Sequence, residues 1–484
     1  MIRPDPMGEL DTFSSAKARR VVFAAAAAMF AVQVELFRGV RLDDAFITFR
    51  YAQNLATGVG FVFNRGERVM GSTSPGEVLL ATVAHFVLGH DAMPGAMAAL
   101  GCAGWTAQAI ALFSLLRRGF GDFRAGLVAI AIGVGAAGSS QWVALETNVA
   151  FAATLVAITC ATRSRWIGAA VACAFAGLMR PDAYIAVAIL GGVCIHQTRS
   201  AAWKPAVAFV TLAAPWPIFA VAYFGHTVPQ SALAKYAQTT HLAYARHILA
   251  DLPHEIAMMP APLVGQIAFW TFALVGSWIA LRSKSLLWIL PVYGALHASA
   301  YVALAPDISF MWHLYPLTAT TVALGLLALG TGLERLSVLT RRAAAGVCVA
   351  LAAAGTIHFA VQYENEPWFG ARQQIYEEVA AYLVSHADPT DIVDAEEVGT
   401  IAYLTNLRMN DHTRLVTPFP GDVFWRFSNG RKTHLRWMLL NGSELLHGRE
   451  RQAFYVPYYE GRPKLMFVRA GWGIAVVDLR APPS

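Results

Sequence analysis

Charged residues are scarce in this sequence, and no arrangement of its cysteines suggests a disulfide framework or a zinc site. Only 14% of the 484 residues are charged, whereas 56% are hydrophobic, and the mean hydropathy is +0.47. A soluble globular protein carries about 25% charged residues, so the composition excludes that class. All five cysteines lie in apolar stretches and none forms a C-x-x-C pair, which is typical of small packing residues.

The sequence also lacks internal repeats and low-complexity tracts other than alanine-rich stretches. Its net charge of +6 does not indicate a nucleic-acid partner, because the basic residues are spread over short loops. Those loops separate apolar runs that recur from residue 21 to residue 361. The chain is therefore predicted to be a polytopic α-helical membrane protein.

The Lys/Arg bias of the short loops predicts the orientation. Basic residues place the tail 1–20 in the cytoplasm, and 21–40 is a retained first span because no small-residue cleavage signal follows it. The run 78–88 is too short for a full crossing, which needs roughly 20 residues. It is predicted to be a re-entrant or surface helix, or a short span in thinned membrane. If it does not cross, about eleven spans result and the C-terminus lies outside.

Composition changes after residue 360, where acidic residues become frequent. The last segment has about 120 residues, enough for its own small core, and shows no nucleophile–base constellation. Its hydrophobic spacing predicts helices over 372–385 and 397–404, a strand over 391–394, and a hairpin of 465–468 with 474–477.

Two adjacent carboxylates, Asp43 and Asp44, stand where the first span ends, in the predicted outer loop one (41–77). Carboxylates at a membrane surface can act as acid or base on a lipid-borne substrate. Two adjacent Asp residues without other polar neighbours can also simply keep the end of a helix in water. A helix over 45–56 follows and carries Arg50.

Under this topology the unusual polar residues gather in outward-facing loops, and polar groups at membrane depth are functional candidates. Each also has an ordinary explanation. Taken one by one, these residues could simply occupy a loop, end a span before a proline, extend as a lysine to the membrane surface, or belong to an aromatic belt. The set comprises Glu146, Arg180, Asp182, Lys235, Asp307, His313 and Tyr315.

The motifs in these loops resemble those of GT-C glycosyltransferases, most closely the bacterial arabinofuranosyltransferase-like members. Three departures are Gly76-Glu77, where an apolar and an aromatic residue are expected, Gln230 in place of Asn, and His313 in place of Arg. The matching stretches, in order, are L-D-D-A-F-I-T-F-R-Y-A, N-R-G-E-R-V and T-S-P in loop one, L-E-T at 145–147, R-P-D at 180–182, G-H-T-V-P-Q-S-A-L-A-K at 225–235, and W-H-L-Y-P at 312–316.

The resemblance implies a GT-C-like membrane domain (21–360) followed by a small α/β domain (361–484) on the outer, periplasmic face of a bacterial inner membrane. It implies transfer of a sugar from a polyprenyl-phosphate donor to a glycan, lipid or protein acceptor. In those proteins the paired Asp lies in the active site. Asp43 is then the candidate base and Asp44 the group that orients the acceptor or stabilises the cationic sugar, with this division of roles left open.

The remaining site candidates follow from the needs of that reaction. A leaving phosphate needs cations, and the candidates are Lys235, Arg180 and Arg50. The substrate-binding candidates are Glu146, Asp182, Thr73, Ser74, His313 and Tyr315.

Two other functions stay open at this point. A transporter or flippase of lipid-linked sugars tends to have two related halves, and the halves of this sequence are unlike. A non-catalytic envelope-assembly protein would explain the outer domain but not the loop-one motif. No cofactor is firmly predicted, and a divalent metal, the acceptor and the anomeric outcome are left open. Only the closest resemblance favours a pentofuranose such as arabinofuranose as the sugar.

Overall fold

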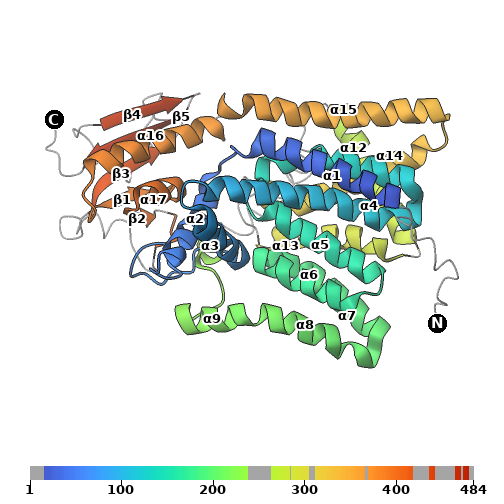
Figure 1. The fold of residues 1–484 in the computed structure, drawn as a ribbon, viewed down its shortest axis with the longest axis horizontal. Helices are drawn as coiled ribbons and strands as arrows, with labels where there is room; N and C mark the ends of the chain where they lie inside the picture. The colour runs from blue at the N-terminus through green and yellow to red at the C-terminus, as the bar shows by residue number, and fades with distance from the viewer. Residues whose placement is uncertain are drawn as a thin grey trace.

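Long helices run along one axis of the molecule and a mixed sheet lies at one end of them (Figure 1). The chain enters α1 at the far end from the sheet, and its last strands belong to the sheet. The computed structural model describes residues 16–237, 263–283, 285–304, 311–365, 369–411, 413–417, 435–441, 464–469 and 472–478.

Six of the described helices are long and apolar enough to cross a membrane, and four shorter apolar helices accompany them. The chain is a multi-pass membrane protein, as its composition predicts; the number of spans stays a prediction. The apolar helices are α1 (Ala16–Phe37), α3 (Pro75–Leu88), α4 (Met93–Gly133), α5 (Thr147–Thr162), α6 (Trp166–Met179), α7 (Tyr184–Thr198), α8 (Trp203–Ala213), α9 (Pro215–Phe224), α12 (Leu263–Arg282), α13 (Ile289–Leu304), α14 (Tyr315–Leu333) and α15 (Val338–Gln362).

The helix α4 reverses direction within its length. Gly121 has a φ of +80°, a conformation that residues with a Cβ rarely adopt, and it separates two helical halves. The halves pack against each other, since Trp105 Nε1 donates to the carbonyl of Ile132 at 2.7 Å. The irregular stretch that follows packs tightly on α4, where a Cβ on Gly101 would lie 1.9 Å from the carbonyl oxygen of Val143. The two small residues Gly101 and Gly104 thus allow backbone to lie directly on the helix.

The short helix α3 begins and ends on the side of the sheet. Before its first turn, Gly71 lies against Leu415 of the C-terminal part. After its last turn, the carbonyl of His90 accepts a 2.6 Å hydrogen bond from Tyr403 of the same part. Between these contacts its outer face is apolar and exposed, as at Phe86. Whether 78–88 crosses the membrane stays a prediction.

The described residues of the C-terminal part form a five-stranded sheet and two helices. Its strand order is β2-β1-β3-β5-β4, with β1 parallel to β2 and β3, and with β5 antiparallel to β3 and β4. The predicted helix over 372–385 and the predicted hairpin are confirmed. The elements are α16 (Gly370–His386), β1 (Ile392–Ala395), α17 (Gly399–Thr405), β2 (Arg408–Asp411), β3 (Leu435–Asn441), β4 (Lys464–Arg469) and β5 (Trp472–Asp478).

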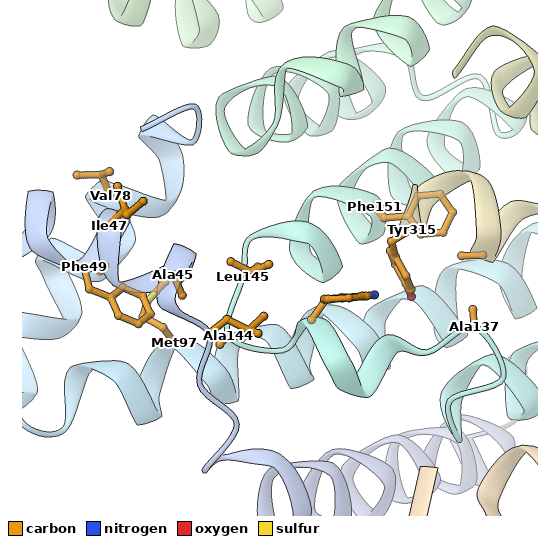
Figure 2. Close-up of a cluster of buried hydrophobic side chains, with 14 of the residues drawn as sticks. Ala45, Ile47, Phe49, Val78, Met97, Ala137, Ala144, Leu145, Phe151 and Tyr315 are labelled. Carbon is orange, nitrogen blue, oxygen red and sulfur yellow. The ribbon is translucent and has the colours of Figure 1, made fainter. Parts of the chain in front are cut away.

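One apolar core joins the helix α2 (Asp43–Ala56) to the long helices. Figure 2 shows Ile47 and Phe49 of α2 near Val78 of α3, with Leu145 and then Phe151 further into the bundle. Burial of this face fixes the direction of α2, because its apolar side chains have to leave water together. The first turn of α2, which carries the two carboxylates, is thereby held at the junction between the long helices and the C-terminal part.

Candidate active site

A cavity of about 450 Å³ lies where the loops at the sheet end of the long helices meet. This is within the usual size range of a small-molecule site. Its wall is built from loop one, the ends of α6 and α13, the start of α10 (Gln230–Ala237) and Leu415 of the C-terminal part. Seven residues singled out from the sequence line it, namely Asp44, Thr73, Ser74, Glu146, Arg180, Asp182 and His313.

The two adjacent carboxylates have different surroundings. Asp44 lines the cavity, whereas Asp43 is not part of its wall. The oxygens of Asp43 accept hydrogen bonds from the backbone N–H groups of Gly399 (3.0 Å) and Thr400 (2.8 Å), at the start of α17. A carboxylate in this position satisfies free amides and faces the positive end of the helix dipole. Successive residues on a helix point about 100° apart, which explains why the two side chains have different surroundings.

Close contact between α2 and α17 depends on a glycine. A Cβ on Gly399 would lie 2.0 Å from the backbone oxygen of Asp43, so no larger residue fits there without a shift of the backbone. Loop one is fastened to the C-terminal part at a second point as well. The Asn64 amide donates to the carbonyl of Met409 at 2.9 Å and accepts from the Met409 N–H at 3.0 Å. Loop one and the C-terminal part therefore form one structural unit beside the cavity.

A third carboxyl group, that of Glu397, approaches the pair from the C-terminal part. One oxygen from each of Asp43, Asp44 and Glu397 lies within 4.8 Å of the others. Burial and the charges of the two aspartates raise the pKa of Glu397 to about 8, while the paired Arg372 opposes this rise. The three groups could hold a divalent cation by their chemistry, but Arg372 already supplies a cation to Glu397 and backbone amides occupy Asp43.

Sequence reasoning did not select Glu397 as a site residue. Glu397 lies in the segment A-E-E-V-G-T-I-A-Y-L-T-N, at the start of the helix predicted over 397–404. Two acidic residues, Glu396 and Glu397, shortly before the start of this helix were the available signal, because acids favour helix N-termini. That signal did not identify the aspartates some 350 residues earlier as the neighbours of Glu397.

Arg180 lies at the centre of a buried polar cluster in the cavity wall. It donates to Glu146 Oε1 at 2.9 Å and to Asp182 Oδ2 at 2.7 Å, and it lies 3.3 Å from His313 Nδ1. Only 4% of Arg180 is exposed. Asp182 is contacted by Tyr301 OH at 3.3 Å as well. Two carboxylates therefore match the one guanidinium, as burial of a charge requires.

Two candidates from the sequence lie away from the cavity wall. Arg50 donates to Gln53 Oε1 at 2.8 Å and to the side chain of Asn406, and so bridges α2 to the residue after α17. The hydroxyl of Tyr315 forms hydrogen bonds of 2.6 Å with Ser139 and with Gln108. Figure 2 shows Tyr315 beside Phe151 within the bundle, where the two rings meet edge to face. In this structure the side chains of Arg50 and Tyr315 therefore each join separate parts of the chain.

Two further candidates fall outside what the structure describes. Lys235 belongs to α10, but its side chain is outside the described residues, and so is Asp307. The start of α10 is held by hydrogen bonds to loop one and to the C-terminal part. The N–H of Gln230 donates to the carbonyl of Met70 at 2.8 Å, and its side-chain amide donates to the carbonyl of Arg414 at 2.8 Å.

Comparison with solved structures identifies the fold. ArnT from Cupriavidus metallidurans in the apo state matches with a TM-score of 0.60 at 15% identity, and the same protein bound to undecaprenyl phosphate matches with 0.58 at 12%. Both alignments cover 97% of this chain and 100% of ArnT. The Archaeoglobus fulgidus oligosaccharyltransferase matches with 0.52 at 12% identity over 90% of this chain and 71% of its own.

These neighbours are GT-C proteins, so the chain has the GT-C fold that its loop motifs predict. No family model matches the sequence, and no curated protein sequence matches it significantly. The identities are low enough that the comparison establishes the fold, while activity has to be argued from the site.

Proposed function

We propose that this protein is a glycosyltransferase that moves a sugar from a polyprenyl-phosphate donor to an acceptor hydroxyl group. The observation that carries the proposal is that one cavity collects Asp44, the Arg180 cluster and the loop-one hydroxyls Thr73 and Ser74 from distant parts of the chain. Undecaprenyl phosphate bound to a protein of the same fold supports the class of donor.

Asp44 is the proposed base. The acceptor oxygen attacks the anomeric carbon, the bond from that carbon to the phosphate oxygen breaks, and the acceptor proton passes to the Asp44 carboxylate. A positioned base of this kind typically contributes about 10²–10⁴-fold in rate. Asp44 lines the cavity, whereas both oxygens of Asp43 accept hydrogen bonds from backbone amides, which favours Asp44 over Asp43 as the base. Asp43 instead fixes the turn that presents Asp44.

The buried cluster around Arg180 is proposed to bind sugar hydroxyl groups. Glu146 and Asp182 offer acceptor oxygens, and the guanidinium of Arg180 holds both carboxylates in place through its N–H groups. Rigid polar groups orient a bound sugar without losing side-chain entropy on binding. His313, which stands where the resembling proteins have Arg, contacts this cluster and is proposed to influence which sugar fits.

The site is proposed to face the outer leaflet, with the C-terminal domain (361–484) in the periplasm. The basic loops of the sequence support that orientation, because they connect the helices at the ends away from the site, and basic loops favour the cytoplasm. A pentose such as arabinofuranose is the first donor sugar to test, and the acceptor is a glycan, a lipid or a protein.

The test is transfer by the purified full-length protein from a panel of polyprenyl-phosphate sugars to membrane extracts. The wild type should transfer one sugar, and Asp44→Asn should lose at least 100-fold in rate, by the range given for a positioned base. Asp122→Asn is the matched control, since Asp122 is exposed and pairs with Arg117 away from the cavity. Absence of transfer from every donor, or full activity of Asp44→Asn, would overturn the proposal.

A further inference from the structure

The first turn of α10 contributes to the cavity wall a buried hydroxyl group with no hydrogen-bond partner among the described residues. Ser231 and Ala232 form part of the cavity wall. Only 7% of Ser231 is exposed, and within the described residues its Oγ has no hydrogen-bond partner. Buried polar groups are nearly always hydrogen-bonded, so an unmatched hydroxyl in the wall of a cavity calls for a ligand atom.

The position of this hydroxyl favours an anion. Ser231 is the second residue of α10, and the N-terminal end of a helix carries a partial positive charge. A hydroxyl donor at such an end is suited to a phosphate oxygen. Across the cavity wall, Ser72, Thr73 and Ser74 provide further hydroxyl groups from loop one.

Two of the three cations first considered for the phosphate, Arg180 and Arg50, are engaged elsewhere. The charge of Arg180 is matched by Glu146 and Asp182, and Arg50 contacts Asn406 outside the wall. A phosphate placed against the Arg180 cluster would face two carboxylates at close range, which is unfavourable. The start of α10 offers positive potential without that penalty. Lys235 is four residues further along the same helix.

We infer that Ser231, at the N-terminal end of α10, binds the phosphate of the lipid-linked donor. This inference rests on the proposed function, because it assigns one part of the donor to one part of the same cavity. The sugar then lies between the phosphate and the Arg180 cluster, with Asp44 on the cavity wall beside it.

Binding of undecaprenyl phosphate to the purified full-length protein in lipid nanodiscs tests the inference. The variants are Ser231→Thr and Ser231→Val, which have the same shape and differ only in the hydroxyl group. Thr should bind undecaprenyl phosphate roughly tenfold more tightly than Val, because a hydrogen bond to a charged oxygen is lost in Val. Undecaprenol, which lacks the phosphate, should bind both variants equally.

The same pair of substitutions at Ser299 is the control. Ser299 is exposed on α13 and its hydroxyl bonds to its own helix, so Thr and Val should not differ there. Equal affinity of the two Ser231 variants for undecaprenyl phosphate would overturn the inference. The inference would also be overturned if the Thr and Val variants differed as much in affinity for inorganic phosphate as for undecaprenyl phosphate, and if the lipid form were not preferred. Ser231 would then belong to a site for free phosphate.

A failure of the proposed function gives a different result. In that case the wild type itself would not prefer undecaprenyl phosphate to undecaprenol. A wild type that prefers the phosphate, together with equal Ser231 variants, would leave the glycosyltransferase proposal standing and place the phosphate elsewhere in the cavity.

Discussion

Replacing Asp43 and Asp44 separately by Asn should give two different defects, although the residues are neighbours of the same type. Asp43→Asn removes the charge that faces the start of α17 but keeps one oxygen for the N–H groups of Gly399 and Thr400. Asp44→Asn removes a charge from the cavity wall and leaves those two hydrogen bonds in place.

The magnitude of the first defect follows from the two contacts. A capping side chain contributes about 0.5–2 kcal/mol, and a charge at a helix terminus contributes about 0.3–1 kcal/mol when exposed and up to roughly 2 kcal/mol when partly buried. Loss of the charge at the start of α17 should therefore cost about 1–2 kcal/mol in local opening. This corresponds to roughly 5–30-fold faster amide exchange in the peptide that covers α17.

Hydrogen–deuterium exchange and transfer kinetics on the same preparations separate the two effects. Asp43→Asn should exchange faster over α17, while its transfer rate falls only as far as the loosened contact moves Asp44. Asp44→Asn should leave exchange over α17 unchanged and lose about 10²–10⁴-fold in transfer rate.

The reasoning would be refuted by the reverse pattern. If Asp43→Asn abolished transfer with unchanged exchange over α17, then Asp43 would be the catalytic group and the capping contact would be of no consequence. Equal loss of transfer in both variants without any exchange effect would likewise contradict the separation of roles.

Three other predictions concern Glu397, Tyr315 and the orientation of the chain. The pKa of Glu397 is raised from 4.5 to about 8, so the stability it contributes is complete below about pH 4.5 and is lost as the pH rises through about 8. The melting temperature of the wild type should therefore fall between about pH 6 and about pH 9, and that of Glu397→Gln should change less. Identical pH profiles of the two proteins would contradict this assignment of the pKa. Tyr315→Phe leaves Ser139 and Gln108 without their shared hydroxyl and should cost about 1–3 kcal/mol in unfolding free energy, with an unchanged transfer rate per folded molecule; a specific loss of rate would return Tyr315 to the substrate site. A reporter fused after Ser484 should be active only outside the cytoplasm, and cytoplasmic activity would reverse the orientation of the site.

Local patterns in the sequence were sufficient for several elements. The spacing of Ile375, Val379 and Leu383 places one apolar stripe on a helix, and α16 buries those three side chains. The alternation around 465–477 likewise predicts the hairpin of β4 and β5. These features depend on near neighbours in the chain, whose spacing is visible in the sequence itself.

The sequence also predicted which loops would meet. Seven candidates chosen by motif and by membrane orientation lie around one cavity. This succeeded because a membrane restricts loops to two faces, so a set of polar loops with one orientation is already confined to a thin layer. The same reasoning could not say which side chains within that layer point into the cavity.

The tertiary structure alone distinguished Asp43 from Asp44, and it alone gave Arg50 and Tyr315 their partners. The contacts that decide these roles join residues far apart in the chain, such as Asp43 with Gly399 and Arg50 with Asn406. A sequence pattern reports residue type and local spacing, whereas the direction of a side chain at the end of α2 depends on how α17 packs against it. The sequence therefore determined the membrane class and the loops that meet at the cavity, and long-range packing decided which of their residues line it.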